Sequence, residues 1–246
     1  PWAPLKVDQI AWAKQYTARK QMAVYWLLKF AAQCSMIQKE IITMTSVSNN
    51  LLTGDMMESS LHHRAAHTNA ADAGVVMTED KFRGHLNLRG NPQDAAFMTA
   101  AESVLGAVLP TTPHTSVANG DTVVYWLCPN EWLLIVASGT QGQVEADLRV
   151  AMGDQHIAIT DVSSGQTLVN LSGSGLAQLL QKSTVYDCHE SNFPAGKVVQ
   201  TTFAKTGTTM CKREDGSMDL VIRRSFSDYF FLWMQDASAE YGLWVA

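Results

Sequence analysis

The sequence contains little cysteine, glycine, proline or charge. Its four cysteines, Cys34, Cys128, Cys188 and Cys211, lie far apart and form no CxxC pair. A disulfide scaffold and a zinc or redox motif made of paired cysteines are therefore excluded, and we expect reduced, buried thiols. With 16 glycines, 7 prolines and 46% hydrophobic residues among 246, the chain is neither collagen-like nor of low complexity. It is long enough to bury a core in one large domain or two small ones.

Long apolar runs and basic stripes are also missing. The longest apolar run, from Met22 to Ala32, is interrupted by Lys29, so no segment reaches the roughly 18 apolar residues that a membrane span needs. A net charge of −5 without aromatic residues placed among basic ones argues against nucleic-acid binding. The chain begins at Pro1 without a signal-peptide pattern. We expect a cytoplasmic protein with no nucleic-acid or membrane partner.

The charge that is present is unevenly distributed. Residues 1–43 carry six basic and two acidic side chains, contain no glycine and hold three of the 7 tryptophans. They are predicted to form a helical extension whose apolar positions, from Met22 to Ile37, surround the helix and need a partner to cover them. The polar stretch that opens at Met44 is typical of an ordinary protein start. Residues 1–43 are therefore either an artefact of the assigned start or a true docking extension, and composition leaves both open.

The next segment, residues 44–79, is interpreted as a polar arm or linker, because it shows no period from Ser46 to about Thr78. Within it, His63 and His67 are four residues apart, a spacing that on a helix can hold a metal. The glutamate of an HExxH site is missing. A solvated arm is the preferred interpretation, and no metal ligand is assigned.

Residues 80–246 are predicted to form one α+β domain. In its first half the pattern indicates a strand, a helix that starts at Asn91-Pro92 and ends at Gly106, a hairpin, a helix and a strand. The predicted ranges are 85–89, 91–105, 122–127, 132–137, 143–152 and 156–160. This order is the βαββαβ unit of ferredoxin-like folds.

The second half nearly repeats this order. We expect strands at 166–171, 198–205, 208–212 and 218–223, with a helix at 176–182. The last helix is indicated by an apolar stripe made of Phe226, Tyr229, Phe230, Trp233, Met234, Ala237 and Tyr241. The sequence thus predicts two pseudo-repeated ferredoxin-like βαββαβ-type units, preceded by the helical extension.

Few residues are candidates for chemistry. The turn Ser172-Gly-Ser-Gly175 precedes a helix, as phosphate loops do, but it lacks the third glycine of GxGxxG and the Lys-Ser/Thr pair of a Walker loop. We interpret it as a tight strand-to-helix turn. Asp161, Asp187 and Glu190 are possible acids or bases, although carboxylates near turns more often cap helices or face water.

Three tryptophans, Trp126, Trp132 and Trp233, fall on the predicted hairpin and last helix, and core packing is preferred over an interface role for them. No GxSxG elbow occurs, and none of the 7 histidines has a recognisable nucleophile partner. The sequence therefore assigns no catalytic, cofactor-binding or metal-binding residue to this chain. A domain with a good core and no catalytic cluster is commonly a binding or assembly module.

Seven segments in order resemble the gamma subunits of heterotetrameric sarcosine oxidases. They are LNLRG at 86–90, LG with LP at 105–110, YWLCPNEWLL at 125–134, DVSS at 161–164, LSG at 171–173, FPAG at 193–196 and RRSF at 223–226. The resemblance runs from about Asp80 to Leu243. That family is similar to the folate-binding domain of glycine-cleavage T-proteins, which agrees with the doubled ferredoxin-like fold.

The resemblance implies a non-catalytic structural subunit. The implied complex oxidatively demethylates sarcosine to glycine with hydrogen peroxide, and passes a one-carbon unit to tetrahydrofolate. FAD, FMN, NAD, tetrahydrofolate and zinc are then expected on the partner alpha, beta and delta subunits. Where T-proteins carry paired acids for aminomethyl transfer, this chain has Thr208-Thr-Met-Cys-Lys-Arg-Glu214, which lacks the pair.

Two alternatives stay open. The chain is an independent folate-binding or degenerate aminomethyltransferase-like protein, or it is a regulatory module whose Ser172–Gly175 turn binds an anion. The missing acids count against the first. Whether the parent enzyme prefers sarcosine or another N-methyl amino acid does not follow from the sequence.

Overall fold

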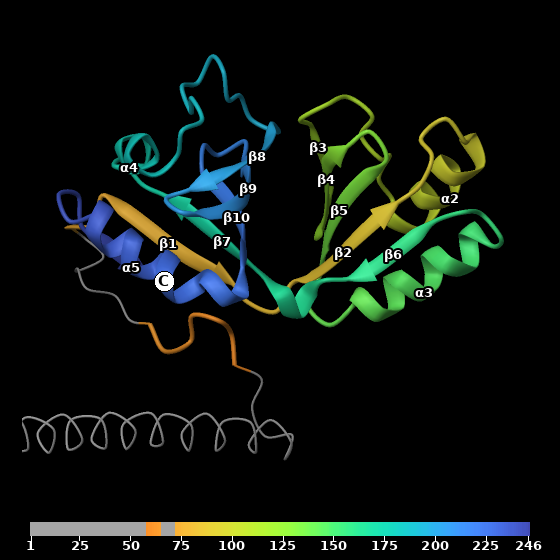
Figure 1. Ribbon diagram of the computed structural model, residues 1–246, viewed down its shortest axis with the longest axis horizontal. Coiled ribbons are helices and arrows are strands. Elements are labelled where there is room, and N and C mark those ends of the chain that lie inside the picture. Colours follow the sequence, from red (N-terminus) through yellow and green to blue (C-terminus); the bar gives the residue numbers. More distant parts are fainter. Residues whose placement is uncertain (1–57, 65–71) are drawn as a thin grey trace, which may run out of the picture. The chain divides into compact units, whose positions relative to one another are not determined.

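The computed structural model describes residues 58–64 and 72–246 (Figure 1). The chain divides into two compact units, Pro1–Glu58 and Ser59–Ala246. The second unit is described below. The predicted helical extension at 1–43 and the candidate ligand His67 lie outside the described residues.

The first half of this unit is built on a five-stranded antiparallel sheet. Its elements are β2 (Gly84–Arg89), α2 (Ala95–Leu105), β3 (Ser116–Asn119), β4 (Thr122–Cys128), β5 (Glu131–Val136), α3 (Gln141–Met152) and β6 (Ala158–Asp161). The strand order is β3-β4-β5-β2-β6. Without the short edge strand β3, this is the ferredoxin-like order, in which the strand after the second helix lies beside the first strand. The predicted βαββαβ unit is confirmed.

The second half forms a six-stranded sheet. Its elements are β1 (Val75–Asp80), β7 (Gln166–Ser172), α4 (Leu176–Ser183), β8 (Val198–Phe203), β9 (Thr206–Lys212), β10 (Met218–Arg223), α5 (Ser227–Ala237) and β11 (Leu243–Val245). The order is β11-β1-β7-β10-β9-β8. The position beside β7, which a strand after α5 would fill in a simple repeat, is held by β1. The α+β pseudo-repeat is confirmed, with this exchange of strands.

Strand β1 corrects the prediction of a polar arm up to residue 79. Val75, Met77 and Glu79 are buried while their neighbours are less so, and the strand pairs antiparallel with β7 and parallel with β11. The acidic end of VVMTED obscures the alternation in the sequence, because a buried glutamate does not count as apolar.

The start of α2 is a second correction. The helix begins after Asp94, whose carboxylate accepts hydrogen bonds from the amides of Ala96 (2.9 Å) and Phe97 (3.5 Å). Asn91 instead caps a preceding turn through the amide of Gln93. The predicted end at Gly106 is confirmed, and this residue has a φ of +63° that glycine tolerates best.

The buried face of α5 also differs from the predicted stripe. The buried positions are Ser227, Phe230, Phe231, Met234 and Ala237. Phe226 is 43% exposed and Tyr241 lies beyond the end of the helix. The sheet faces a stripe displaced by about one position, because Phe231 packs inward and Tyr229 does not.

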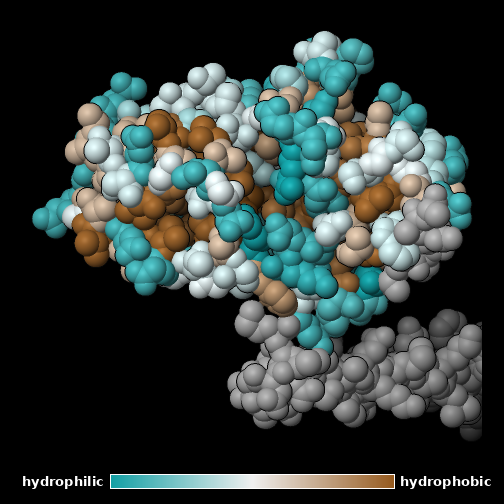
Figure 2. Space-filling view, turned by 180° about the vertical axis from the view of Figure 1, so that it is seen from behind, coloured by the Kyte–Doolittle hydropathy of each residue, from teal (hydrophilic) through white to brown (hydrophobic). Residues whose placement is uncertain are grey.

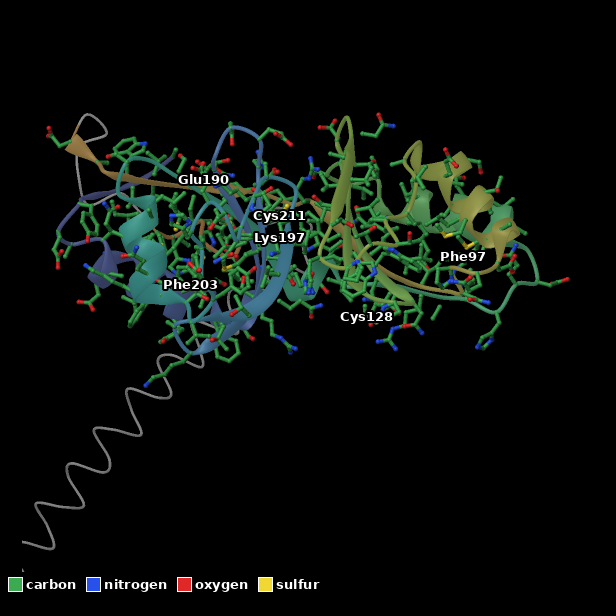
Figure 3. The ribbon with its side chains drawn as sticks, turned by 90° about the horizontal axis from the view of Figure 1, so that it is seen from above. Phe97, Cys128, Glu190, Lys197, Phe203 and Cys211 are labelled. Atoms are coloured by element: carbon green, nitrogen blue, oxygen red, sulfur yellow. The ribbon has the colours of Figure 1, made fainter. Side chains whose placement is uncertain are left out.

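Three clusters make up the core. Helices α2 and α3 pack on one face of the first sheet, and α4 and α5 on one face of the second (Figure 1). The opposite faces of the two sheets meet through a third cluster, which contains Tyr125, Leu133, Ile135, Leu168, Val198, Cys211 and Val221. Phe97 and Phe203, labelled in Figure 3, belong to the two separate helix-side clusters.

Residues 58–64, here called the strap, pack on the second half. Leu61 is 4% exposed, and the Ser60 hydroxyl donates to Glu79 at 2.9 Å. Arg64 pairs with Asp228 of α5 at 2.6 Å. This part of the predicted solvated arm is therefore docked. Within the described ranges, no helix is long and apolar enough to cross a membrane.

Candidate functional site

A cavity of about 600 Å³ lies between the β3–β4 hairpin of the first half and the β9–β10 hairpin of the second. Each hairpin contributes a residue to the third core cluster, Tyr125 from β4 and Cys211 from β9. We call this cavity the hairpin cleft. Its polar lining consists of Asp80, Arg83, Ser116, Asp121, Tyr125, Cys211, Lys212, Arg213, Glu214, Asp215 and Asp219. Hydrophilic side chains gather where the two halves meet, in the middle of Figure 2.

Asp219 is the most buried carboxylate of the cleft, at 4% exposure. It occupies the second position of β10, a strand whose first five residues are all buried. Its Oδ1 accepts a hydrogen bond from Asn170 Nδ2 at 2.8 Å. Its Oδ2 accepts from Arg213 Nε at 2.7 Å and from the Tyr125 hydroxyl at 3.4 Å. Both carboxylate oxygens are thus satisfied, as a buried charge requires.

Arg213 is held by one nitrogen only. Its side chain is 44% exposed, and among the described residues its two terminal nitrogens have no hydrogen-bond or ion-pair partner. Burial lowers the pKa of this guanidinium, but the hydrogen bond and charge of Asp219 outweigh burial and leave it above its ordinary value. The side chain therefore presents a permanently charged pair of donors at the cleft.

Two buried side chains form the floor of the cleft, Tyr125 and Cys211, and neither is prepared for proton transfer or nucleophilic attack. Burial raises the pKa of Tyr125 well above its ordinary value. Burial also raises the pKa of the Cys211 thiol, which lies 3.5 Å from the Ser116 hydroxyl. Both groups are protonated at neutral pH, whereas general acids and bases work best with a pKa near the operating pH. The floor is suited to hydrogen bonding.

The rim of the cleft is mixed in charge, with an excess of acids. Arg83 lies 3.7 Å from Asp80 and 3.7 Å from Asp121, so its charge is shared between two carboxylates. Glu214 is exposed at the tip of the β9–β10 hairpin. Asp215 accepts hydrogen bonds from the amide and hydroxyl of Ser217, which lower its pKa. Asp215 is therefore held in its charged form at neutral pH.

A second groove of about 660 Å³ also lies between the halves. It is lined mostly by neutral groups, including four threonines, Gln166 and Gln200. Gln200 donates to the carbonyl of Leu127 at 2.9 Å and so joins the two halves across the groove. Burial of Glu131, at the edge of the groove, raises the pKa of its carboxyl, but hydrogen bonds from Asn87 and Arg89 outweigh burial and leave the pKa below its ordinary value. This groove has the character of a structural junction.

The three carboxylates suggested by the sequence do not come together. Asp161 accepts from the amide of Ser163 at 2.9 Å and caps a short turn after β6. Asp187 accepts from the amide of His189 and from Asn192, which lower its pKa. Glu190 is 87% exposed and lies 3.7 Å from Lys212. None of the three lines the hairpin cleft, and each has the turn or surface role that the sequence favoured.

The glycine turn at 172–175 does not fit a phosphate. The amide of Gly175 donates to the carbonyl of Gly74 at 2.8 Å, and that of Leu176 donates to Gly173 at 3.2 Å. A Cβ at Gly173 would lie 2.3 Å from the Gly74 oxygen, so the chain before β1 fills the space that an anion would need. These contacts support the interpretation as a tight turn and count against the anion-binding alternative, because the amides of Gly175 and Leu176 already have acceptors within the chain.

The two histidines of the strap, His62 and His63, have partners within the fold. His63 lies 2.7 Å from Asp228, and His62 lies 2.7 Å from the carbonyl of Ser59. Throughout residues 58–64 and 72–246, no three His, Cys, Asp or Glu side chains form a metal-binding group. Cys128, Cys188 and Cys211 are free thiols, and the first and last are separate in Figure 3.

The tryptophans divide into one core residue and two half-buried ones. Trp132 is fully buried, and its indole donates to the carbonyl of Pro110 at 2.7 Å. Trp126 is half-buried and lies against the His114 ring. Trp233 is also half-buried and donates to the Ser183 hydroxyl at 3.0 Å. Core packing is confirmed for Trp132, and Trp126 and Trp233 pack as partly buried side chains against the first-half and second-half core clusters.

The sequence reasoning missed the group formed by Tyr125, Arg213 and Asp219. One signal was present, since Asp219 is a lone carboxylate among apolar residues in MDLVIR. A charge in a strand buried on both faces requires a partner. Which residues supply the partner depends on the contact between the two halves, and the local pattern contains no information about that contact.

Comparison with known proteins identifies the family. Residues 89–240 match the family described as "Sarcosine oxidase, gamma subunit family". The chain belongs to this family. Sarcosine oxidase subunit gamma from Corynebacterium sp. strain P-1 is 28% identical over 198 residues, covering 79% of this chain and 96% of the relative. The subunit from an Arthrobacter species is 27% identical over the same shares of the two chains.

One solved structure supports the same assignment, and a second shares the fold. A chain of the heterotetrameric sarcosine oxidase from Corynebacterium sp. U-96, in complex with pyrrole 2-carboxylate, superposes with a TM-score of 0.69 at 26% identity, covering 75% of this chain and 96% of that chain. Aminomethyltransferase T of the glycine cleavage system from Bartonella henselae superposes with a TM-score of 0.53 at 12% identity, covering 76% and 49%. The gamma-subunit fold is therefore also T-protein-like.

Proposed function

We propose that this chain is a structural, non-catalytic subunit of a heterotetrameric sarcosine oxidase. The observation that carries the proposal is the agreement, over nearly the whole length of the relatives, with gamma subunits and with a chain of a solved heterotetramer. The complex would oxidise sarcosine to glycine with release of hydrogen peroxide and transfer of a one-carbon unit to tetrahydrofolate. In this proposal the partners are the alpha, beta and delta subunits, and the complex is cytoplasmic.

The state of the ionisable groups supports a non-catalytic role. Asp219 is fully paired, and Tyr125 and Cys211 are held protonated by burial. The glycine turn at 172–175, the place most similar to a phosphate loop, is filled by the chain's own backbone. In this proposal the chain has no catalytic residue, and FAD, FMN, NAD, tetrahydrofolate and zinc belong to the partner subunits, as the family resemblance implies.

The proposed domain organisation follows the family match. Residues 80–246 would form the gamma-like domain, completed by β1 from residue 75, and residues 44–79 would connect it to a helical extension at 1–43. Because the strap and β1 lie within 44–79, the connection is shorter than the sequence suggests.

Co-expression tests the subunit role. The four chains are expressed together, and the complex is isolated through a tag on the alpha subunit. The gamma chain is expected in stoichiometric amount, and omitting it should lower the yield of assembled oxidase. Recovery of a complete, stable oxidase without this chain, or failure of the chain to enter the complex, would contradict the proposal.

Turnover of the assembled complex tests the non-catalytic role. Asp161→Asn, Asp187→Asn and Glu190→Gln, together with Tyr125→Phe in the cleft, should each leave sarcosine turnover within about tenfold, which corresponds to ~1.4 kcal/mol of barrier. A loss of about 10²-fold or more with the complex intact is the effect of removing a general acid or base. Such a loss would place this chain in the chemistry.

A titration separates the proposal from independent folate binding. The isolated chain should bind no tetrahydrofolate, as measured by fluorescence or calorimetry. Saturable binding by the chain alone would favour the alternative of an independent folate-binding or aminomethyltransferase-like protein.

A further inference from the structure

We propose that the hairpin cleft binds a small zwitterion, a molecule of α-amino-acid size that carries one carboxylate and one ammonium group. This goes beyond the proposed subunit role, because the site consists of residues of this chain alone. The cleft volume of about 600 Å³ lies in the range of small-molecule pockets.

The carboxylate end is assigned to Arg213. Asp219 fixes the guanidinium through Nε at 2.7 Å, and Asn170 and Tyr125 in turn fix Asp219. This hydrogen bond holds Arg213 in the lining of the cleft, and its two terminal nitrogens have no partner among the described residues. A guanidinium presented in this way binds a carboxylate through two parallel hydrogen bonds, and little side-chain freedom is lost because the arginine is already positioned.

The ammonium end is assigned to the acidic rim. Asp121 and Glu214 stand on the tips of the two opposing hairpins, and both line the cleft. The Arg83 guanidinium lies 3.7 Å from the Asp121 carboxylate and compensates only part of its charge. Glu214 has no hydrogen-bond or ion-pair partner among the described residues. An ammonium group between the tips would therefore gain charge-assisted hydrogen bonds.

The charge of the lining selects against other ligands. A simple anion would meet Arg213, but the rim carboxylates would repel it. A simple cation would be attracted by the rim but would leave the prepared guanidinium unused. A molecule that carries both charges matches both regions, and the neutral Tyr125, Ser116 and Cys211 at the floor add no further charge requirement.

Calorimetric titration of the full-length chain tests the proposal. Sarcosine and glycine are the probes, and acetate and methylamine are the single-charge controls. We expect saturable binding of at least one zwitterion with a Kd of about 1 mM or below, and at least tenfold weaker binding of both controls. Circular dichroism establishes beforehand that each chain is folded.

Three variants locate the site. Arg213→Lys keeps the charge but removes the paired donors, and should weaken binding at least tenfold. Glu214→Gln, at an exposed hairpin tip where folding is little affected, should weaken binding severalfold. Arg223→Lys, a matched exposed arginine that lines the other groove, should change nothing.

Several outcomes would overturn the proposal. These are the absence of saturable binding by the folded chain, equal binding of acetate, or equal binding by the Arg213→Lys and Glu214→Gln variants. If the free chain binds no zwitterion but Arg213 becomes inaccessible to phenylglyoxal on assembly, the cleft instead receives a segment of a partner subunit. Assembly yield is not a readout here, so failure of this proposal leaves the subunit role unaffected.

Discussion

The two halves of the domain follow the same plan but complete their sheets differently. In the first half the strand beside β2 is β6, which follows α3 directly, so the whole unit is continuous from Gly84 to Asp161. In the second half the strand beside β7 is β1, which precedes the first half in the chain. The sheet of the second half is therefore complete only when β1, which precedes the first half in the chain, pairs with β7.

This difference separates local from long-range folding. The first-half core joins residues from Leu86 to Ile159, whereas the second-half core joins Leu61 and Val75 to Leu243. Contacts between distant parts of a chain require the larger loop-closure entropy and form more slowly. The first half is therefore expected to be the more autonomous of the two, and substitutions in the two halves are expected to act differently.

The largest expected effect is in the first half. Trp132 is completely buried against Phe97, and its indole donates to Pro110. Trp132→Ala removes this packing and leaves a buried carbonyl without its donor, so the free energy of unfolding should fall by about 3–5 kcal/mol. Chemical denaturation followed by circular dichroism measures the change. A loss of less than about 1 kcal/mol would mean that the first half repacks around the gap.

The strap provides the corresponding test of the second half. Leu61 is buried in the second-half core, and burying a leucine contributes about 1.5–3 kcal/mol. Leu61→Ala should therefore lower stability by roughly 2 kcal/mol. The pair of Arg64 with Asp228 adds less than about 1 kcal/mol, because Asp228 is 60% exposed.

A shortened chain is the matched control for the strap. A chain that begins at Met44 keeps the strap and β1, and its unfolding midpoint should equal that of the full chain within the measurement error. A decrease of several degrees would show that residues 1–43 contribute to the stability of the domain.

Most of the fold follows from local pattern. The strand at 218–223 is predicted with its observed bounds, and the hairpin strands and α3 within two residues, because alternation and helical periodicity act within one element. What the pattern misses are β1, β3 and β11, which are short or carry polar residues at buried positions. β1 and β11 pair with strands that are distant in sequence, whereas β3 forms a tight hairpin with the adjacent β4.

Less of the candidate site than of the fold can be predicted from the sequence. Tyr125, Arg213 and Asp219 come from three strands or turns in two halves, and only the packing of one sheet against the other brings them together. The glycines of the turn at 172–175, which resemble a phosphate loop in the sequence, are required by packing, because Gly74 and Tyr241 lie close against them. The polar residues of the cleft are therefore recognised by their burial and their hydrogen-bond partners, and no sequence motif marks them.

A smaller loss of stability is expected from the substitution of Trp233 in the second half. This side chain is half-buried at the flank of α5, with one hydrogen bond to Ser183. Trp233→Ala should cost about 1–2 kcal/mol, clearly below the cost at a fully buried tryptophan. Trp233→Phe, which removes the indole N–H but keeps an aromatic ring at this position, is the control. If the alanine variant loses as much stability as Trp132→Ala, Trp233 contributes to the second-half core as much as a fully buried tryptophan does.

The smallest expected effect concerns the junction of the two halves. His85 of the first half is 1% exposed, and its Nδ1 lies 3.0 Å from Gln166 Oε1 of the second half. Burial lowers the pKa of this histidine below 6.5, and the hydrogen bond to Gln166 offsets only part of that shift. In the pH range between the lowered folded value and 6.5, the unfolded chain binds a proton that the folded chain does not. Stability must therefore fall as the pH is lowered below about 6.5, by at most ~1.4 kcal/mol per pH unit.

His85→Gln should flatten this dependence in urea denaturation series, and His156→Gln, at an exposed position, should not. An unchanged slope in His85→Gln would mean that the acid sensitivity arises elsewhere and that the two halves stay joined when His85 is charged.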